Sequence, residues 1–147
     1  MKKRYRHITG RVNPKMFRLL VAGGRDFYDY KYIDEVLTDW YVNDFSENRK
    51  IYTDLESGVT VVHGDGNGVD RIAGMWAVYN NLGVEAYPAK WNSLGYKAGH
   101  IRNQEMIQSG VNYAILFPGG KGTSNMQNQL IEAHIDFFFA VPNKVYS

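Results

Sequence analysis

The stretch Leu116–Met126, LFPGGKGTSNM, runs from an apolar segment through a glycine-rich loop into residues with helical spacing. The apolar segment is typical of a buried strand, so the loop follows the carboxyl end of that strand. Gly119, Gly120 and Gly122 let a ligand approach the backbone, and N–H groups at the start of a helix suit an anion such as phosphate. In that interpretation Thr123 donates its hydroxyl to the phosphate. The alternative is a tight strand-to-helix turn in which Thr123 caps the helix.

Short apolar runs alternate with helical stretches along most of the chain, without internal repeats or low-complexity segments. This alternation predicts an α/β fold: a single domain with a doubly wound, mainly parallel sheet of five strands. The expected strands fall within residues 17–23, 58–64, 84–89, 112–120 and 137–143. The expected helices fall within residues 30–42, 69–83, 98–110 and 123–135.

Right-handed crossovers leave two common strand orders for such a sheet, one with the first strand central and one flavodoxin-like. We expect the first, 3-2-1-4-5, whose winding direction reverses between strands one and four; ligands bind at the crevice that forms there. The loops after those strands, Gly23–Phe27 (GGRDF) and Pro118–Thr123 (PGGKGT), are then neighbours. The loop His63–Asp70 (HGDGNGVD) lies beside the first. Three glycine-rich loops are thus expected at one edge of the sheet.

Length and composition favour one intracellular globular domain. The chain has 147 residues, of which 44% are hydrophobic, enough for a core of its own. It contains no cysteine, which excludes disulfides and thiolate metal sites and fits a cytoplasmic protein. No apolar run reaches the roughly 18 residues that a membrane span needs, and the first residues lack the apolar core of a signal peptide. We therefore expect no membrane partner.

Basic residues are concentrated at the amino-terminus. Residues 1–15 hold six of the 17 basic residues and no acidic one, which leaves 11 basic against 15 acidic in residues 16–147, a net charge of −4. Nucleic acid is therefore not the expected partner of the body of the protein. We divide the chain into a basic arm, 1–15, and a ligand-binding domain, 16–147. The arm is interpreted as solvated, as an edge strand, or as a contact to nucleic acid or an acidic partner. The polar segment 43–57 is either a long loop or a peripheral element.

Two of the expected loops carry charged residues beside their glycines. In GGRDF, Arg25 and Asp26 either form an ion pair or act on a ligand, with Arg25 on a phosphate and Asp26 orienting it or the sugar. In HGDGNGVD, the glycine spacing fails the dinucleotide fingerprint GxGxxG at Val69, but a glycine-rich turn before a helix still suits an anion. Asp70 either favours the helix dipole or contacts ribose hydroxyls. His63 is either a structural histidine or a ligand contact.

The segment Trp91–Met106 adds a third group of polar and aromatic residues. Arg102 and Asn103 fall near the start of an expected helix, where they either face solvent or reach the same phosphate pocket. Trp91 and Tyr96 either stack on a base or belong to the core.

No metal site or hydrolytic triad is expected. His100 and His134 are interpreted as surface positions, and no HExxH or similar ligand spacing occurs. No Ser/His/Asp arrangement is evident. We therefore predict neither a metal nor a cofactor.

Four motifs, VAGGRDF, VVHGDGNGVDRIA, AGHIRNQEM and FPGGKGTSNM, follow one another in this order. Together they resemble the SLOG superfamily (the SMF/DprA–LOG group), and within it the YspA-like branch, over residues 17–141. The resemblance implies a Rossmann-like fold, a homo-oligomer and the binding or sensing of a nucleotide or nucleotide-derived small molecule, ADP-ribose-like or a nucleoside phosphate. One alternative is a nucleoside monophosphate phosphoribohydrolase, as in LOG members of the superfamily. A weaker alternative is nucleic-acid binding through the basic arm; DprA members of the superfamily bind single-stranded DNA.

The resemblance also implies ligand-binding positions. Carried over by position, they are Gly23, Gly24, Arg25, Gly64, Gly68, Asp70, Arg102, Asn103, Gly119, Gly120, Gly122 and Thr123. The LOG pattern PGGxGTxxE requires a glutamate where this chain has Met126. This departure supports the YspA-like branch and favours a ligand-binding protein over an enzyme. Catalytic residues stay unassigned; Asp26 and Glu105 are the candidate carboxylates for an N-glycosidic hydrolase.

Overall fold

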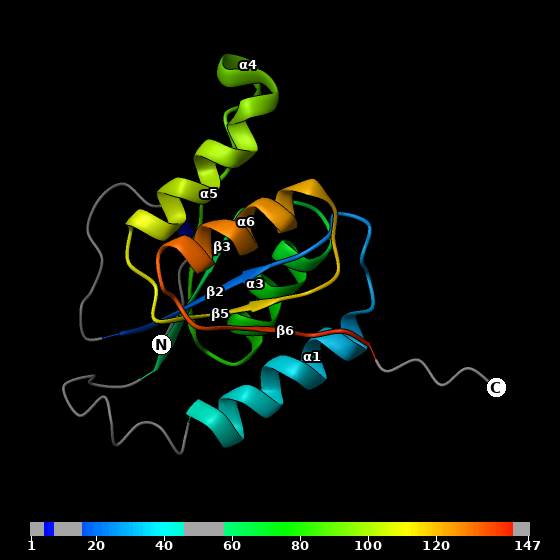
Figure 1. The fold of residues 1–147 in the computed structure, drawn as a ribbon. Coiled ribbons are helices and arrows are strands. Elements are labelled where there is room, and N and C mark those ends of the chain that lie inside the picture. Colours follow the sequence, from blue (N-terminus) through cyan, green and yellow to red (C-terminus); the bar gives the residue numbers. More distant parts are fainter. Residues whose placement is uncertain (1–4, 8–15, 46–57, 143–147) are drawn as a thin grey trace.

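The computed structural model describes residues 5–7, 16–45 and 58–142, and of residues 5–7 only the backbone. These residues form one parallel sheet flanked by helices (Figure 1). The strands are β1 (Tyr5–His7), β2 (Phe17–Ala22), β3 (Val59–His63), β4 (Gly83–Ala86), β5 (Tyr113–Leu116) and β6 (Phe137–Phe139). The helices are α1 (Tyr30–Asp39), η1 (Trp40–Phe45), α3 (Val69–Tyr79), α4 (Trp91–Leu94), η3 (Gly95–Lys97), α5 (Ala98–Gln108) and α6 (Lys121–Glu132).

The sheet order is β1-β4-β3-β2-β5-β6, and every neighbouring pair is parallel. The five expected strands therefore have the predicted order 3-2-1-4-5, with β2 central. The sixth strand, β1, pairs with the outer side of β4. This confirms the edge-strand interpretation for Tyr5–His7. The rest of the basic arm and residues 46–57 lie outside the described residues.

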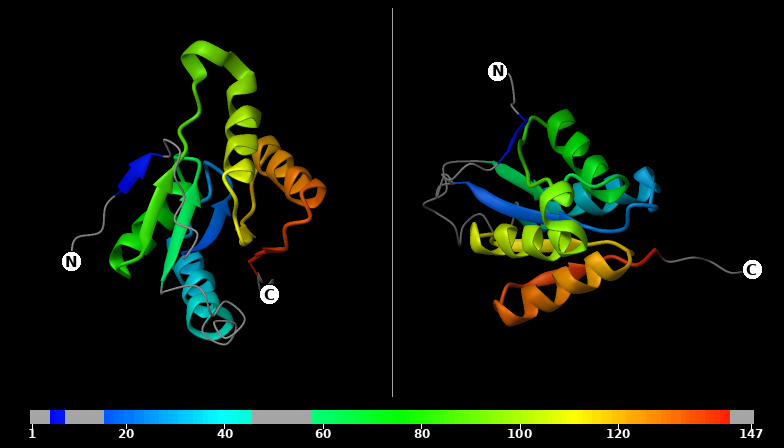
Figure 2. Two further views of the ribbon diagram at one scale, coloured as in Figure 1. Left: turned by 90° about the vertical axis from the view of Figure 1, so that its left-hand side faces the viewer. Right: turned by 90° about the horizontal axis from the view of Figure 1, so that it is seen from above.

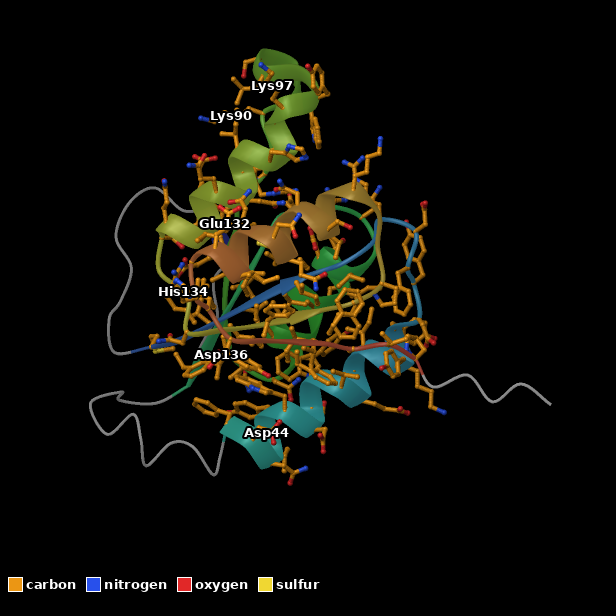
Figure 3. The ribbon with its side chains drawn as sticks, viewed as in Figure 1. Asp44, Lys90, Lys97, Glu132, His134 and Asp136 are labelled. Carbon is orange, nitrogen blue, oxygen red and sulfur yellow. The ribbon has the colours of Figure 1, made fainter. Side chains whose placement is uncertain are left out.

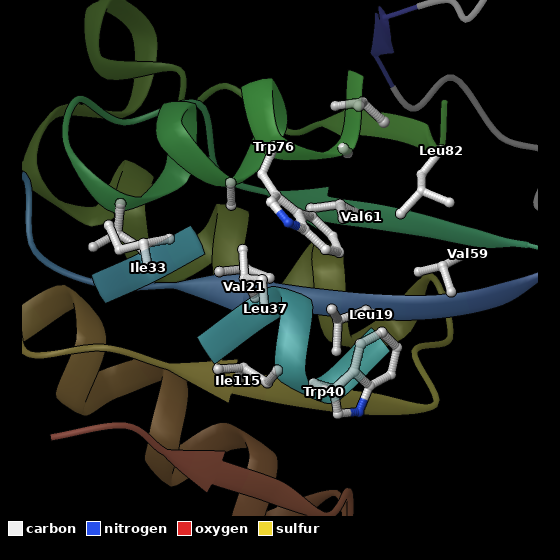
Figure 4. Packing of buried hydrophobic residues seen from close by; sticks show 14 of the residues in the cluster. Leu19, Val21, Ile33, Leu37, Trp40, Val59, Val61, Trp76, Leu82 and Ile115 are labelled. Atoms are coloured by element: carbon white, nitrogen blue, oxygen red, sulfur yellow. The ribbon is translucent and has the colours of Figure 1, made fainter. Parts of the chain in front are cut away.

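The strands separate two apolar cores because their side chains alternate between the faces of the sheet. Leu19 and Val21 of β2 belong to the core under α1 and α3 (Figure 4). Leu20 belongs to the core under α5 and α6. Views of the sheet from the side and from above show the two helical layers on its opposite faces (Figure 2). The carboxyl ends of the strands consequently share one edge, and the loops that leave that edge are held by both layers.

Helix α1 begins at a side-chain cap and continues into an aromatic cluster. The carboxylate of Asp29 accepts a hydrogen bond of 3.1 Å from the N–H of Tyr32, which satisfies one donor of the first turn. The helix passes directly into the π-helical turn Trp40–Phe45, so residues 43–45 of the polar segment are helical. Trp40 and Phe45 pack on Phe17 with ring centroids 5.5 and 5.3 Å apart.

A buried ion pair crosses the sheet beneath α5. The guanidinium of Arg18 donates to the carboxylate of Glu85 and to Ser109 at the end of α5, and both charged side chains are 3% exposed. A buried charge is costly unless it is paired and hydrogen-bonded, so the pair fixes α5 relative to β2 and β4.

The segment α4–η3, with the first turn of α5, projects beyond the sheet (Figure 1). Lys90 and Lys97 lie on this projection (Figure 3). None of the helices in the described ranges is both long enough and apolar enough to span a bilayer.

Candidate functional site

A pocket of about 920 Å³ opens at the carboxyl edge of the sheet. Loops after β2, β3, β4 and β5 line it, together with residues of α4, η3 and α5 and the first turns of α3 and α6. Eleven of the residues expected to bind a ligand line this pocket: Gly23, Gly24, Arg25, Asp26, Gly64, Asp70, Arg102, Asn103, Gly120, Gly122 and Thr123. The three glycine-rich loops and the α5 segment thus meet at one place.

Four other candidates do not line this pocket. Glu105 is exposed on α5, away from the pocket wall. His63 lies on the opposite side of β3, under α3, where a side chain added at Gly74 would lie 2.8 Å from its Nε2 atom. Its Nδ1 accepts a hydrogen bond of 2.9 Å from the N–H of Asp65, and the residue is buried. The remaining two, Gly68 and Gly119, hold the loops together.

Close packing between the loops explains several glycines. Gly24 donates its N–H to the carbonyl of Pro118 at 2.8 Å, which joins the loops after β2 and β5. Gly68 has a φ of +72°, and a Cβ there would lie 2.4 Å from the carbonyl oxygen of Gly24. A Cβ at Gly119 would lie 2.2 Å from Thr123 Oγ1 and 2.7 Å from the Gly24 nitrogen. These glycines therefore serve the fold directly and the site indirectly.

Gly120 and Gly122 have a different environment. A Cβ added at either glycine would meet no atom within 4 Å, so packing does not require glycine there. Gly120 is the N-cap of α6, and no side chain caps this helix. The first N–H groups of a helix have no partner within the helix, so this end of α6 presents free donors to the pocket.

The sequence-based alternative in which Thr123 caps the helix is wrong. Helix α6 begins at Lys121, two residues earlier, and Thr123 is a buried residue of its first turn. Asn103 of α5 joins this turn by donating from Nδ2 to the carbonyl of Gly122 and to Asn125 Oδ1, each at 3.1 Å. The amide of Asn103 thereby fixes the start of α6 relative to α5.

Asp70 is a buried acid in the wall of the pocket. Its side chain is in the first turn of α3, and Oδ2 accepts a hydrogen bond of 3.0 Å from the N–H of Gly66. Oδ1 has no hydrogen-bond partner among the described residues. Burial raises the pKa of Asp70 from 3.8 to about 6, although the amides of Gly66 and Gly64 and the charge of Arg102 act in the opposite direction. This carboxyl group is therefore both poorly solvated and incompletely bonded inside the pocket.

Arg102 is the partly buried cation beside Asp70. Its Nη1 donates to the carbonyls of Gly64 and Tyr87, and its Nε donates to Asn103 Oδ1 at 3.0 Å. Burial is the main cause that lowers its pKa, while the carboxylate of Asp70 raises it. An arginine stays protonated in a protein, so Arg102 supplies a fixed positive charge to the pocket.

Arg25 extends across the pocket from the loop after β2. It is exposed, and its guanidinium carbon lies 5.4 Å from the centre of the Trp91 ring, a cation–π distance. No ion pair with Asp26 is present within the described part of the chain. The ion-pair interpretation of GGRDF therefore does not hold in this structure.

Several pocket residues escaped the sequence analysis. Lys121, Arg71 and Asp65 line the pocket, and Arg71 Nε lies 3.5 Å from Asp65 Oδ1. Lys121 stands inside the motif PGGKGT, and this position in the sequence could have marked it as a pocket residue. Tyr96 was considered for stacking on a base, and its 85% exposure rules out the core alternative. No cluster of three or more metal-ligating side chains occurs among the residues described.

Met126 is fully buried in the core under α5 and α6, together with Leu130. Ala133, near the end of the same helix, is its exposed C-cap. At position 126 the chain therefore directs an apolar side chain into the core.

The fold and the pocket place the protein in a class: doubly wound α/β proteins whose glycine-rich loops meet at the carboxyl edge of a parallel sheet. Within that class the chain belongs to the YspA, cpYpsA-related SLOG family, whose family model matches residues 17–93. The Gene 61 protein of Mycobacterium phage D29 is similar, with 32% identity over 127 residues, covering 82% of this chain and 93% of that protein. No solved structure matches the chain significantly.

Family membership connects the chain with Rossmann-like, nucleotide-related functions. The family match includes the loops after β2 and β3 but ends before α5 and α6. The part of the pocket formed by Arg102, Asn103 and the PGGKGT loop is therefore assigned from geometry.

Proposed function

We propose that the pocket binds a nucleotide or a nucleotide-derived small molecule, either ADP-ribose-like or a nucleoside phosphate. The observation that carries the proposal is the meeting of three glycine-rich loops at one pocket beside the uncapped start of α6. A volume of about 920 Å³ is at the upper end of the range for small-molecule sites, roughly 300–1,000 Å³.

The phosphate is assigned to the first turn of α6. There the backbone donors of the helix end are accessible, since Gly120 and Gly122 place no side chain in front of them. Arg25, Arg102 and Lys121 line the same pocket and supply positive charge. Asp70 disfavours a phosphate at the start of α3 but suits a hydroxyl donor such as a ribose OH, because Oδ1 has an unused acceptor site.

A thermal-shift screen tests the proposal with AMP, ADP, ADP-ribose, ribose 5-phosphate and adenosine. A ligand at 100 times its Kd stabilises the folded state by about 2.7 kcal/mol, and for a chain of this length that corresponds to roughly 5–10 °C in Tm. We expect shifts of this size from at least one phosphorylated compound and smaller shifts from adenosine. Equal shifts from phosphorylated and unphosphorylated compounds would contradict the phosphate assignment.

The variant Gly120→Asp places a carboxylate on the proposed phosphate position. We expect loss of ligand binding with retention of the fold, because an aspartate at an N-cap bonds the free N–H groups itself and stabilises a helix. Gly120→Ala adds a Cβ that meets no atom within 4 Å, so it is expected to bind nearly as tightly as the parent. Ser124→Asp controls for charge, because Ser124 is exposed on α6 and does not line the pocket. If Gly120→Asp binds like the parent, the loop is only a turn.

The buried carboxyl group of Asp70 favours a second candidate function, N-glycosidic hydrolysis. Asp70 carries a carboxyl group whose pKa is raised to about 6 inside the pocket, and such a group suits general acid–base catalysis near neutral pH. Cleavage of the N-glycosidic bond of a nucleoside monophosphate would use it in place of the glutamate that Met126 replaces. Base release measured by chromatography separates this function from binding.

A further inference from the structure

The projecting segment α4–η3 exposes aromatic side chains that the core does not use. Trp91 is 44% exposed and Tyr96 is 85% exposed, and neither α4 nor η3 contains a buried residue. Trp91 and Tyr96 line the same pocket as the glycine-rich loops. Leu94, which is 39% exposed on the same segment, does not line it. Packing in the core therefore does not account for aromatic side chains at positions 91 and 96. Their position at the pocket is consistent with contact to a ligand.

Contacts from two other elements hold the Trp91 ring in place. A Cβ added at Gly99 of α5 would lie 3.2 Å from the Trp91 ring, so the edge of the ring rests on this glycine. The guanidinium of Arg25, from the loop after β2, lies 5.4 Å from the ring centre. A ring fixed in this way loses little conformational entropy when a ligand stacks on it.

The carboxylates that line the pocket are confined to one side of it. Its lining residues between Pro88 and His100, on the projecting side, include no carboxylate. The carboxylates that line the pocket, Asp26, Asp65 and Asp70, come from the loops after β2 and β3 and the start of α3. Lys90 and Lys97 stand on the projecting segment and do not line the pocket (Figure 3). This end suits a planar uncharged group that belongs to a ligand of negative overall charge.

We propose that Trp91 and Tyr96 form the subsite for the aromatic base of the ligand. The inference rests on the proposed function, because it assigns the base of the same molecule whose phosphate lies at the start of α6. Aromatic side chains stack on any nucleobase through its π-face, so this subsite provides affinity for a base and accepts more than one base. Asp70 lines the same pocket, and we assign it to the ribose.

Ligands that differ in whether they carry a base isolate the contribution of the base to the binding affinity. Isothermal titration compares AMP and ADP-ribose with ribose 5-phosphate, which has the sugar and phosphate but no base. In the parent protein the base-containing ligands are expected to bind more tightly. Trp91→Ala should weaken their binding about 5- to 150-fold, the usual effect of removing one stacking ring. Binding of ribose 5-phosphate should stay within about twofold, because the variant leaves the α6 site intact.

Two control variants distinguish stacking from a general effect on the segment. Trp91→Phe keeps an aromatic ring and is expected to retain most of the affinity for AMP. Leu94→Ala removes an exposed apolar side chain of α4 outside the pocket and should change no affinity. Circular dichroism checks that each variant has the parent's secondary structure.

Tryptophan fluorescence reports the contact directly. The other two tryptophans, Trp40 and Trp76, are only 6% and 4% exposed, so Trp91 is the one accessible to a ligand. AMP should quench the emission of the parent more strongly than ribose 5-phosphate does. In Trp91→Phe the quenching should disappear while AMP still binds.

Three results would overturn the inference without refuting the proposed function. If AMP and ribose 5-phosphate bind the parent equally and both depend on Gly120, the phosphate site stands and the base subsite fails. If Trp91→Ala weakens both ligands equally, the tryptophan has a structural role. If Trp91→Ala and Tyr96→Ala only dissociate an oligomer in sedimentation, the aromatic residues form an interface between copies. Absence of binding by every compound would refute the proposed function, and this inference with it.

Discussion

Asp70 is expected to reduce the stability of the protein at neutral pH. Burial raises its pKa from 3.8 to about 6, so the folded state holds a proton that the unfolded state has already released between these two values. Stability therefore falls as the pH rises from about 4 to 6, and the loss persists above pH 6. A shift of this size corresponds to a loss on the order of 3 kcal/mol.

The substitution Asp70→Asn tests this directly. Asparagine has the same shape and carries no charge, and its carbonyl oxygen can still accept the hydrogen bond from the N–H of Gly66. At pH 7.5 we expect the variant to be more stable than the parent by up to about 3 kcal/mol, or roughly 5–10 °C in Tm. Near pH 4 the two proteins should have similar stability, because Asp70 is then protonated in the parent.

Urea unfolding at pH 4, 5, 6 and 7.5 measures the difference between parent and variant. Taking the difference removes the contributions of other titrating groups, including the histidines. Asp26→Asn is the matched control, since Asp26 is exposed in the same pocket and its substitution should change stability by less than about 0.5 kcal/mol. A variant that is less stable than the parent at pH 7.5 would refute the reasoning. A difference that is the same at every pH would also refute it.

Three further predictions concern the phosphate, catalysis and the sheet. Arg25→Ala should weaken phosphorylated ligands more than the matching nucleosides, by roughly 1.5–3 kcal/mol in titration calorimetry; equal losses would place Arg25 outside the phosphate site. A chromatographic assay over a panel of nucleoside monophosphates should show no significant release of free base. Turnover of about 1–10³ per second that disappears in Asp70→Asn or Asp26→Asn would show an enzyme. Glu85→Ala should lower the free energy of unfolding by roughly 3–5 kcal/mol, because it leaves the guanidinium of Arg18 buried without its carboxylate. A loss of unfolding free energy below about 1 kcal/mol would mean that the pair behaves like a surface ion pair.

The strand order was predictable from sequence because the apolar runs are short, regular and separated by helices. Right-handed crossovers then leave few arrangements, and the central position of Phe17–Ala22 follows from one of them. The segment Trp91–Lys97 was not predicted as helix. It is short and exposed, so it lacks the apolar periodicity on which such a prediction depends.

The meeting of the loops was also predictable, but the role of each residue was not. His63 shares its face of β3 with Val59 and Val61, and this alternation is a signal that places its side chain under α3 instead of in the pocket. The start of α6 has no side-chain cap, so nothing in the sequence marked Gly120 instead of Thr123 as the helix boundary. The pairing of Arg18 with Glu85 joins residues 67 positions apart, and no local pattern reveals it.

The position of the phosphate is the central claim, and an NMR titration of ¹⁵N-labelled protein tests it most directly. The amide signals of Gly120 and Gly122 should move on addition of AMP or ADP-ribose and stay in place with adenosine. Gly58 and Gly110 lie before β3 and β5, at the opposite edge of the sheet, and their signals should not move with any compound. Movement of the Gly120 and Gly122 signals with phosphorylated ligands alone would confirm the assignment. Shifts elsewhere in the protein with these two signals unchanged would contradict it.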